Sequence, residues 1–428
     1  MKKIIIRGGY KLHGSINISG SKNASLPILA ATLLFEETVI LENVPMVKDI
    51  LTMINLLETL GKKIIVKKNQ VTILNTNKKK YFAKYDLVKT MRAGILVLGP
   101  LLAKFEKAKV SLPGGCAIGA RPVDIHLDFL KKKGFKNEIK KGYVISSRQN
   151  NKKNINYTFS KISVGATETA ILNSCLSNNK TKINNIALEP EVIDLISFLK
   201  KAGAKINFNK KRSLTIQGVK NLKGIKYKIM PDRIEAGTYL VAAAITNSVL
   251  TINNIVPKHL ENILKVLMKF GVQFKINKKN DLKISPKIRK PINITTAPYP
   301  GFPTDMQAQI MSLLVLTKGT SNIKEDIFEN RFLHVSELNR MGANIKIENN
   351  KAKIIGTNVL SGAEVMATDL RASVCLVLAG LVARGETIIN RVYHLERGYE
   401  NLVKKLKNPL ISQLRHTLVF QQICKLNL

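Results

Sequence analysis

The sequence lacks tryptophan, has only four cysteines and is poor in acidic residues, with 29 Asp and Glu against 69 Lys and Arg. The cysteines, Cys116, Cys175, Cys375 and Cys424, show neither a CxxC pair nor the spacing of metal ligands. Four in 428 residues are also too few for a disulfide scaffold. This scarcity excludes a small disulfide-rich secreted protein and predicts no metal site. We therefore expect a protein of the reducing cytoplasm.

Hydrophobic runs long enough to cross a membrane are missing too. The longest, such as the run from Val374 to Ala383, fall well short of the ~20 residues that a spanning helix needs. The apolar run after Lys2 and Lys3 is interrupted after three residues, which is too short for a signal peptide. We therefore expect no membrane partner.

The formal charge of +40 would by itself favour nucleic acid or another polyanion as partner. Only 14 of the 69 basic residues are arginine, however, and the lysines are scattered among many Asn and Ile. They do not form a stripe with interleaved aromatic residues, and the composition is typical of a coding bias toward A and T. A basic nucleic-acid-binding protein is the alternative from another functional class, but we expect no nucleic acid partner.

The length and an internal repeat both predict two domains. A chain of 428 residues exceeds the size at which a single hydrophobic core stops growing. An amphipathic helical stretch ending in glycine recurs at intervals of 73, 69, 68 and 71 residues, with the glycines at Gly61, Gly134, Gly203, Gly271 and Gly342. Because glycine is the usual residue just past the last helical turn, each of these glycines predicts a helix end.

Two further elements accompany each amphipathic helix. After each glycine comes a period-two apolar pattern with a polar tip, such as Lys210-Lys211 between Phe208 and Leu214, which predicts a β-hairpin. A helix rich in small residues and apolar on most faces precedes each amphipathic one, which predicts burial. These six segments are 23–34, 92–102, 166–176, 234–245, 306–316 and 370–382. The predicted fold class is α/β, with six repeats of buried helix, strand, exposed helix and hairpin in two similar domains of three.

The sixth repeat departs from this pattern at its end. Residues 401–408 lead toward an expected glycine near position 410, but Pro409 stands before it. Residues 410–428 show neither the glycine nor an alternating strand with a polar tip. Because proline ends a helix, we expect the last helix to stop there and the tail 409–428 to diverge from the repeat.

The stretch from Leu112 to Asp124 is the first candidate for chemistry. Three of its glycines surround Cys116, and Arg121 follows five positions later. Glycines allow a backbone to approach a ligand closely, and a thiol near a guanidinium suits work on an anionic substrate. A glycine-rich turn with an inert, buried cysteine is the structural alternative, which the residues alone leave open.

Three other features indicate binding of an anion. Lys22, in the turn from Ser19 to Ala24, opens a buried helix whose amide groups could hold phosphate, although Ser and Asn are also ordinary helix caps. Arginine is scarce in this lysine-rich chain, so each arginine is a candidate for a position where a planar guanidinium must bind a carboxylate or phosphate. Asp305 precedes a helix and is either its cap or a general base. The arginines concerned are Arg92, Arg121, Arg331, Arg371 and Arg397.

Together these motifs resemble the UDP-N-acetylglucosamine 1-carboxyvinyltransferase family of enolpyruvyl transferases over about residues 1–408. The resemblance is carried by residues 21–24, 112–124 with Pro-Gly-Gly-Cys, 231–235, 302–309 and 367–372. It implies two similar domains, each an inside-out α/β barrel of three repeats. One domain would span 22–229, and the other would join 1–21 to 230–428.

The resemblance implies transfer of the enolpyruvyl group of phosphoenolpyruvate to the 3-hydroxyl of UDP-N-acetylglucosamine with release of phosphate. This reaction opens peptidoglycan precursor synthesis and proceeds by addition and elimination through a tetrahedral ketal. Cys116 would protonate the methylene carbon, since a thiol is mostly protonated at neutral pH, and it would be the target of fosfomycin. The related transferase acting on shikimate 3-phosphate is the alternative within the fold, which the Pro-Gly-Gly-Cys loop and residues 121–124 disfavour.

The family's site residues map onto this sequence position by position. The implied catalytic residues are Cys116, Asp305, Lys22 and Arg397. The implied phosphoenolpyruvate-binding residues are Lys22, Asn23, Arg121, Arg371 and Arg397. The implied UDP-sugar contacts are Arg92, Arg121, Pro122, Val123, Asp124, Ile125, Lys161, Ser163, Val164, Gly165, Asp305 and Ile327. Asp369 and Arg331 match further active-site residues, no metal or other cofactor is implied, and we expect a monomer whose partners are its two small-molecule substrates.

Overall fold

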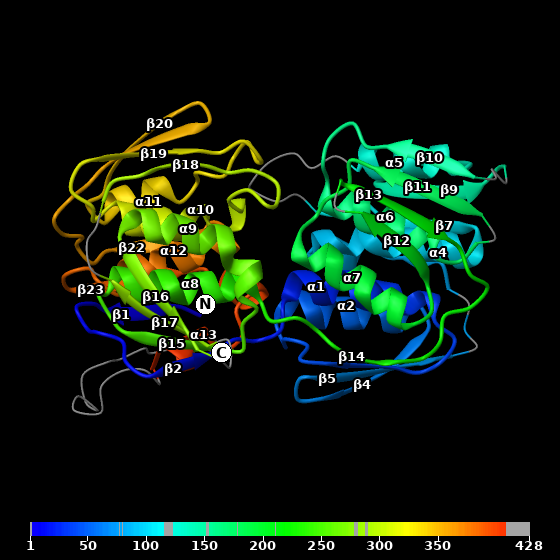
Figure 1. The fold of residues 1–428 in the computed structure, drawn as a ribbon, viewed down its shortest axis with the longest axis horizontal. Coiled ribbons are helices and arrows are strands. Elements are labelled where there is room, and N and C mark those ends of the chain that lie inside the picture. The colour runs from blue at the N-terminus through cyan, green and yellow to red at the C-terminus, as the bar shows by residue number, and fades with distance from the viewer. Residues whose placement is uncertain are drawn as a thin grey trace. The chain divides into compact units, whose positions relative to one another are not determined.

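The computed structural model describes residues 2–76, 78, 80–114, 123–150, 154–177, 179–209, 211–277, 281–286 and 290–407. The chain divides into two compact lobes, which Figure 1 shows as two bodies. Lobe I consists of residues from 20 to 230, and lobe II combines residues 2–19 with residues from 231 onward. No helix in the described ranges combines the length and the apolar character needed to traverse a lipid bilayer.

Lobe I contains three four-stranded sheets, in the orders β14-β3-β5-β4, β6-β7-β9-β8 and β10-β11-β13-β12. Its strands are β3 (Val39–Glu42), β4 (Lys62–Lys67), β5 (Gln70–Asn75), β6 (Phe82–Ala83), β7 (Lys107–Ser111), β8 (Phe135–Lys140), β9 (Tyr143–Arg148), β10 (Ile155–Thr158), β11 (Lys180–Asn184), β12 (Lys205–Asn209), β13 (Ser213–Gln217) and β14 (Lys226–Lys228). Its helices are α1 (Lys22–Ala31), α2 (Lys48–Thr59), α3 (Tyr85–Val88), α4 (Leu98–Phe105), α5 (Asp124–Lys132), α6 (Val164–Ser174) and α7 (Pro190–Lys201), with 3₁₀ turns η1 (Thr32–Leu34) and η2 (Arg92–Val97).

Lobe II contains sheets in the orders β16-β17-β15-β2, β18-β19-β21-β20 and β1-β23-β22. Its strands are β1 (Ile4–Arg7), β2 (Ser15–Asn17), β15 (Leu250–Asn253), β16 (Val272–Ile276), β17 (Leu282–Pro286), β18 (Asn293–Thr295), β19 (Thr320–Lys324), β20 (Asn344–Glu348), β21 (Lys351–Ile355), β22 (Glu364–Met366) and β23 (Glu386–Asn390). Its helices are α8 (Arg233–Ile245), α9 (Glu261–Phe270), α10 (Gln307–Leu314), α11 (Val335–Arg340), α12 (Leu370–Gly380) and α13 (Leu402–Lys407), with 3₁₀ turns η3 (Pro257–Leu260), η4 (Thr304–Met306) and η5 (Val392–Arg397).

The predicted helix ends and hairpins are confirmed. The five repeat glycines, Gly61, Gly134, Gly203, Gly271 and Gly342, all have φ between 90° and 110°, a conformation that costs glycine little and other residues more. Each is followed by an antiparallel pair: β4 with β5, β8 with β9, β12 with β13, β16 with β17, and β20 with β21. The α/β class and the repeats inferred from the sequence therefore stand.

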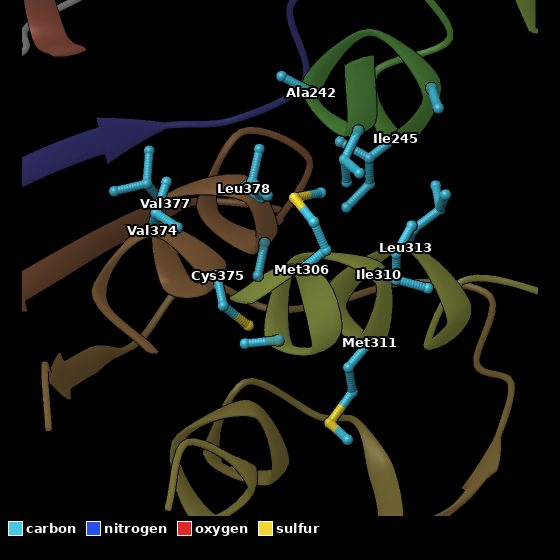
Figure 2. Close-up of a cluster of buried hydrophobic side chains, with 14 of the residues drawn as sticks. Ala242, Ile245, Met306, Ile310, Met311, Leu313, Val374, Cys375, Val377 and Leu378 are labelled. Atoms are coloured by element: carbon cyan, nitrogen blue, oxygen red, sulfur yellow. The ribbon is translucent and has the colours of Figure 1, made fainter. Parts of the chain in front are cut away.

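The small-residue helices form the core of each lobe. In lobe II, α8, α10 and α12 pack against one another, and all thirteen residues of α8 are buried. Figure 2 shows Ile245 of α8, Ile310 of α10 and Leu378 of α12 meeting in one apolar cluster. Burying a side chain of this size contributes roughly 1.5–3 kcal/mol, so these contacts hold the three helices in fixed positions relative to one another.

The predicted segment 92–102 is not one helix. Its first half is the 3₁₀ turn η2, and α4 begins only at Leu98. Pro100 lies in the first turn of α4, where its missing N–H is tolerated, whereas inside a longer helix it would remove a hydrogen bond. The proline therefore favours a new helix start just before it.

Each sheet also contains a short strand that the sequence pattern did not predict. Each of these short strands pairs in parallel with one inner strand of its sheet; they are β14, β6, β10, β2, β18 and β22, paired with β3, β7, β11, β15, β19 and β23. In the sixth sheet β1 pairs antiparallel with β23, with Ile4 opposite Ile389. β1 thus takes the position that the second hairpin strand has in the other five sheets. The described part of this sheet has three strands, and the predicted divergence at 409–428 lies outside the described residues.

Candidate functional site

Two buried guanidiniums hold the carboxylate of Asp305 in lobe II. Arg331 donates from Nη2 to Oδ1 over 2.8 Å, and Arg371 donates from Nη2 to Oδ2 over 2.8 Å. The two arginine side chains are 4% and 6% exposed, and that of Asp305 is 29% exposed. The two guanidiniums and the carboxylate together carry a net charge of +1, so the cluster can attract an anion.

Local structure explains how these side chains are placed. Asp305 lies in the 3₁₀ turn η4 after Pro303, and its carboxylate binds the arginines. Arg371 is the second residue of α12, whose start is capped by Asp369: Oδ1 accepts from the amides of Arg371 and Ala372 over 2.7 and 3.1 Å. A capped helix start fixes the backbone from which Arg371 projects.

The segment carrying Ile327 is tied to the same place. Buried Glu325 accepts from the Ile327 amide through Oε1 over 2.9 Å and from the Thr304 hydroxyl through Oε2 over 2.9 Å. Thr304 directly precedes Asp305, so Glu325 joins the two segments. Arg397 ends η5 and is followed by Gly398, where a Cβ would lie 2.6 Å from Leu370 Cδ2. That close approach packs the Arg397 segment onto the start of α12.

In lobe I the predicted anion residue Lys22 is the first residue of α1. Ser21 caps this helix by accepting from the Ala24 amide over 3.3 Å. The Lys22 ammonium lies 3.1 Å from Oδ2 of Asp49, with side chains 12% and 6% exposed. An ammonium beside a helix start attracts anions, and Asp49, which the sequence did not single out, orients it.

The predicted UDP-sugar residues of lobe I gather at the starts of α5 and α6. Asp124 and Ile125 begin α5, and Ser163 caps α6 by accepting from the Ala166 amide. His126 of α5 faces α6, with its Nδ1 2.8 Å from the hydroxyl of Thr169 on α6. A Cβ at Gly165 would be 3.2 Å from His126 Cε1. The histidine ring therefore connects the two segments, and no pattern in the sequence had indicated this histidine.

The remaining predicted residues fall in three groups. Lys161 lies in an exposed turn before Ser163, and Val123 is buried just before α5. Arg92 begins η2 and lies close enough to His126 to lower its pKa. Cys116, Arg121 and Pro122 lie outside the described residues. The structure thus brings one set of predicted residues together in lobe II, around Asp305, and another in lobe I, around His126, and it places Lys22 and Asn23 at the start of α1.

Two buried histidines each contribute a loss of stability in mild acid, which the buried carboxyl groups of Glu235 and Asp194 oppose, because burial raises their pKa values to about 7 and about 6 and the folded state takes up their protons over the same range. Burial lowers the pKa of His126 to about 4, helped by the charge of Arg92, and burial lowers the pKa of His334 to about 4. In the unfolded chain both titrate near 6.5, so between pH 7.5 and 5 the unfolded state takes up protons that the folded state refuses. Taken alone, each histidine should lower the free energy of unfolding by about 2 kcal/mol over this range.

Urea unfolding of the whole chain at several pH values measures the pH dependence of the free energy of unfolding. His126→Gln, which keeps a polar side chain but cannot be protonated, removes the contribution of His126, so its free energy of unfolding at pH 5, relative to that at pH 7.5, should be about 2 kcal/mol higher than in the unsubstituted chain. An identical pH dependence in that variant would contradict the assignment of His126 as a buried neutral group.

No group of three or more His, Cys, Asp or Glu side chains that could hold a metal ion occurs in the described part of the chain. The cluster around Asp305 instead offers ion pairing, and the lobe I groups offer an ammonium and helix starts. The cluster around Asp305 can bind an anionic group and has a carboxylate available to accept a proton, and Lys22 with its helix start can by itself bind a phosphate.

Comparison with known proteins agrees with these features. The family model of EPSP synthase (3-phosphoshikimate 1-carboxyvinyltransferase) matches residues 6–406. A UDP-N-acetylglucosamine 1-carboxyvinyltransferase from Pelagibacter ubique is 56% identical, over 95% of this chain and 98% of that protein. One from Endomicrobium trichonymphae is 50% identical, over 95% and 97% of the two chains.

Solved structures show the same fold. The enolpyruvyl transferase NikO from Streptomyces tendae superimposes with a TM-score of 0.86 at 23% identity, over 95% of this chain and 97% of that chain. EPSP synthase from Acinetobacter baumannii superimposes with a TM-score of 0.72 at 15% identity, over 96% and 98%. In the described residues the strands of each lobe form three separate sheets rather than one closed barrel wall.

Proposed function

The chain belongs to the UDP-N-acetylglucosamine 1-carboxyvinyltransferases within the EPSP synthase family, and on that premise we propose that it transfers the enolpyruvyl group of phosphoenolpyruvate to the 3-hydroxyl of UDP-N-acetylglucosamine. The observation that carries the proposal is the carboxylate of Asp305 held by two buried guanidiniums. This cluster combines a carboxylate that can accept the proton of the sugar hydroxyl with two cations that can bind phosphoenolpyruvate.

The roles follow from the chemistry of each group. Arg371 and Arg331 bind the carboxylate of phosphoenolpyruvate, because a guanidinium fork matches a carboxylate. Lys22, with Arg397 and Arg121, binds its phosphate. The residues at the starts of α5 and α6, with Ile327, bind the UDP-sugar.

The reaction consists of an addition and an elimination. Asp305 takes the proton of the sugar hydroxyl while that oxygen bonds to the central carbon of phosphoenolpyruvate, and Cys116 gives its proton to the methylene carbon. The resulting ketal then returns a proton from the new methyl group to the Cys116 thiolate as the bond between the central carbon and the phosphate oxygen breaks, and the proton held by Asp305 leaves with the phosphate. Phosphate and the enolpyruvyl ether are the products.

Pairing with two cations stabilises Asp305 as an anion, and it also couples the two substrates. When the carboxylate of phosphoenolpyruvate takes over the contact with Arg371, Asp305 loses part of its ion pairing and becomes a better proton acceptor. Binding of phosphoenolpyruvate, the molecule that the sugar oxygen attacks, thereby activates Asp305 as the base.

A two-substrate phosphate-release assay tests the proposal. Phosphate should appear only when UDP-N-acetylglucosamine and phosphoenolpyruvate are both present. Release with shikimate 3-phosphate in place of the UDP-sugar would favour the related transferase instead. No release with either acceptor, from folded protein, would refute both.

Gly165→Ala tests the UDP-sugar site. The new Cβ would lie 3.2 Å from His126 Cε1, so the ring or the segment must shift by a few tenths of an ångström. We expect KM for the UDP-sugar to rise roughly threefold to tenfold, with KM for phosphoenolpyruvate unchanged. Steady-state kinetics with each substrate varied in turn measures this, and a rise for phosphoenolpyruvate alone would contradict the assignment.

A further inference from the structure

We propose that Tyr399 is a positioning residue that fixes the guanidinium of Arg371 in the orientation needed to receive the carboxylate of phosphoenolpyruvate. The inference rests on the proposed function and extends it to a side chain behind the site. Tyr399 is 4% exposed and follows η5, so it does not itself present a group to solvent.

The Tyr399 hydroxyl is where the three buried helices of lobe II meet through polar groups. Arg371 of α12 donates to it from Nη1 over 3.1 Å, and Gln309 of α10 donates from Nε2 over 3.3 Å. Thr238 of α8 has its hydroxyl 2.9 Å away. Gln309 also donates from Nε2 to the backbone oxygen of Asp305 over 2.8 Å. The same network therefore reaches both members of the Arg371–Asp305 ion pair.

The direction of each hydrogen bond can be assigned. The Thr238 hydroxyl donates to the backbone oxygen of Ile234 over 2.8 Å, which uses its only proton. Tyr399 must then donate to Thr238, which also accepts from Gln309 Nε2 over 3.3 Å, and the lone pairs of the Tyr399 oxygen face Arg371 and Gln309. A hydroxyl has one donor and two acceptor positions, so the hydroxyl of Tyr399 is fully used and cannot rotate without losing a bond.

A neutral phenol suits this role better than a carboxylate would. Burial raises the pKa of Tyr399, although the positive charge of Arg371 opposes this shift. The tyrosine therefore stays uncharged and orients Arg371 without cancelling its charge. With Nη1 on Tyr399 and Nη2 on Asp305, the guanidinium plane stays fixed even after a substrate takes over the contact with Nη2.

The test compares two tyrosine substitutions in the full chain. Tyr399→Phe removes the acceptor of Arg371, and we expect KM for phosphoenolpyruvate to rise about tenfold or more, with KM for the UDP-sugar within about twofold. The matched control is Tyr239→Phe, because Tyr239 is 0% exposed and its hydroxyl has no hydrogen-bond partner among the described residues. It should leave both KM values unchanged.

A second variant guards against loss of folding. Thr238→Val keeps the shape but removes the group that accepts the Tyr399 proton, so it should raise KM for phosphoenolpyruvate in the same direction by a smaller factor. Protection against thermal unfolding by added phosphoenolpyruvate should weaken in parallel, which gives a readout independent of turnover.

The outcomes are distinct. Wild-type KM for phosphoenolpyruvate in folded Tyr399→Phe, or in Thr238→Val should Tyr399→Phe not fold, would overturn the role of Tyr399. Equal effects of Tyr399→Phe and Tyr239→Phe would do the same, because they would indicate a general loss of packing. Absence of two-substrate phosphate release in the unsubstituted chain would instead refute the proposed function.

Discussion

Replacing Cys116 by serine is expected to reduce turnover by about two to four orders of magnitude. A serine hydroxyl is a much weaker acid than a thiol, so it cannot deliver a proton to the methylene carbon of phosphoenolpyruvate at a useful rate. The same change should abolish covalent inactivation by fosfomycin, which requires a sulfur nucleophile. Phosphate-release kinetics and the mass of the protein after treatment with fosfomycin measure both effects.

Two buried cysteines supply the controls for this experiment. Burial raises the pKa of Cys175 to about 12, and it also raises the pKa of Cys375. Neither thiol forms a thiolate at neutral pH, and structural buried cysteines of this kind are inert. Cys175→Ser should therefore keep fosfomycin inactivation. Unchanged alkylation of Cys116→Ser would remove Cys116 from the reaction.

Asp305→Asn should affect both catalysis and stability. An amide cannot take the proton of the sugar hydroxyl, so turnover should fall by about two to four orders of magnitude. The change also leaves Arg331 and Arg371, whose side chains are 4% and 6% exposed, without their shared counterion. Because Asp305 itself is partly exposed, we expect a loss of about 1–3 kcal/mol in the free energy of unfolding.

Asp326→Asn is the matched control, since it removes a carboxylate of the same lobe at the surface. Its carboxylate pairs with Lys324 and accepts from Asn350 Nδ2 over 2.8 Å. Lys324 is 42% exposed and Asp326 is 36% exposed, so the cost should stay within about 0.5 kcal/mol and turnover should not change. Urea unfolding and phosphate release measured on both variants decide the matter. Wild-type turnover in Asp305→Asn would mean that another group acts as the base.

The repeated elements of the fold were readable from the sequence because they follow local rules. Gly271 ends a helix because of its left-handed backbone conformation, with φ of 110°, and polar tips turn strands back on themselves. The parallel strands were missed because they are too short for a period-two pattern: β6 is only Phe82–Ala83. Their pairing depends on segments far apart in the chain, which local periodicity does not encode.

The site was partly readable for a different reason. The scarcity of arginine drew attention to Arg331 and Arg371, and the structure pairs both with Asp305. Asp49, His126 and Tyr399 were missed, because each is informative only through the residue it contacts. A lone aspartate, histidine or tyrosine in a sequence is most often a helix cap, a polar group of the core or a packing residue. No spacing pattern in the sequence distinguishes the few that contact a functional residue.

The antiparallel pairing of β1 with β23 has a consequence for synthesis on the ribosome. Lobe I is formed from residues between 20 and 230, whereas the pairing of Ile4 in lobe II requires Ile389, which is synthesised much later. At ~5–20 residues per second the nascent β1 strand stays without this partner for roughly 20 to 80 s. Lys2, Lys3 and Arg7 flank its three isoleucines, and such charges keep an unpaired apolar strand from joining neighbouring chains during that interval.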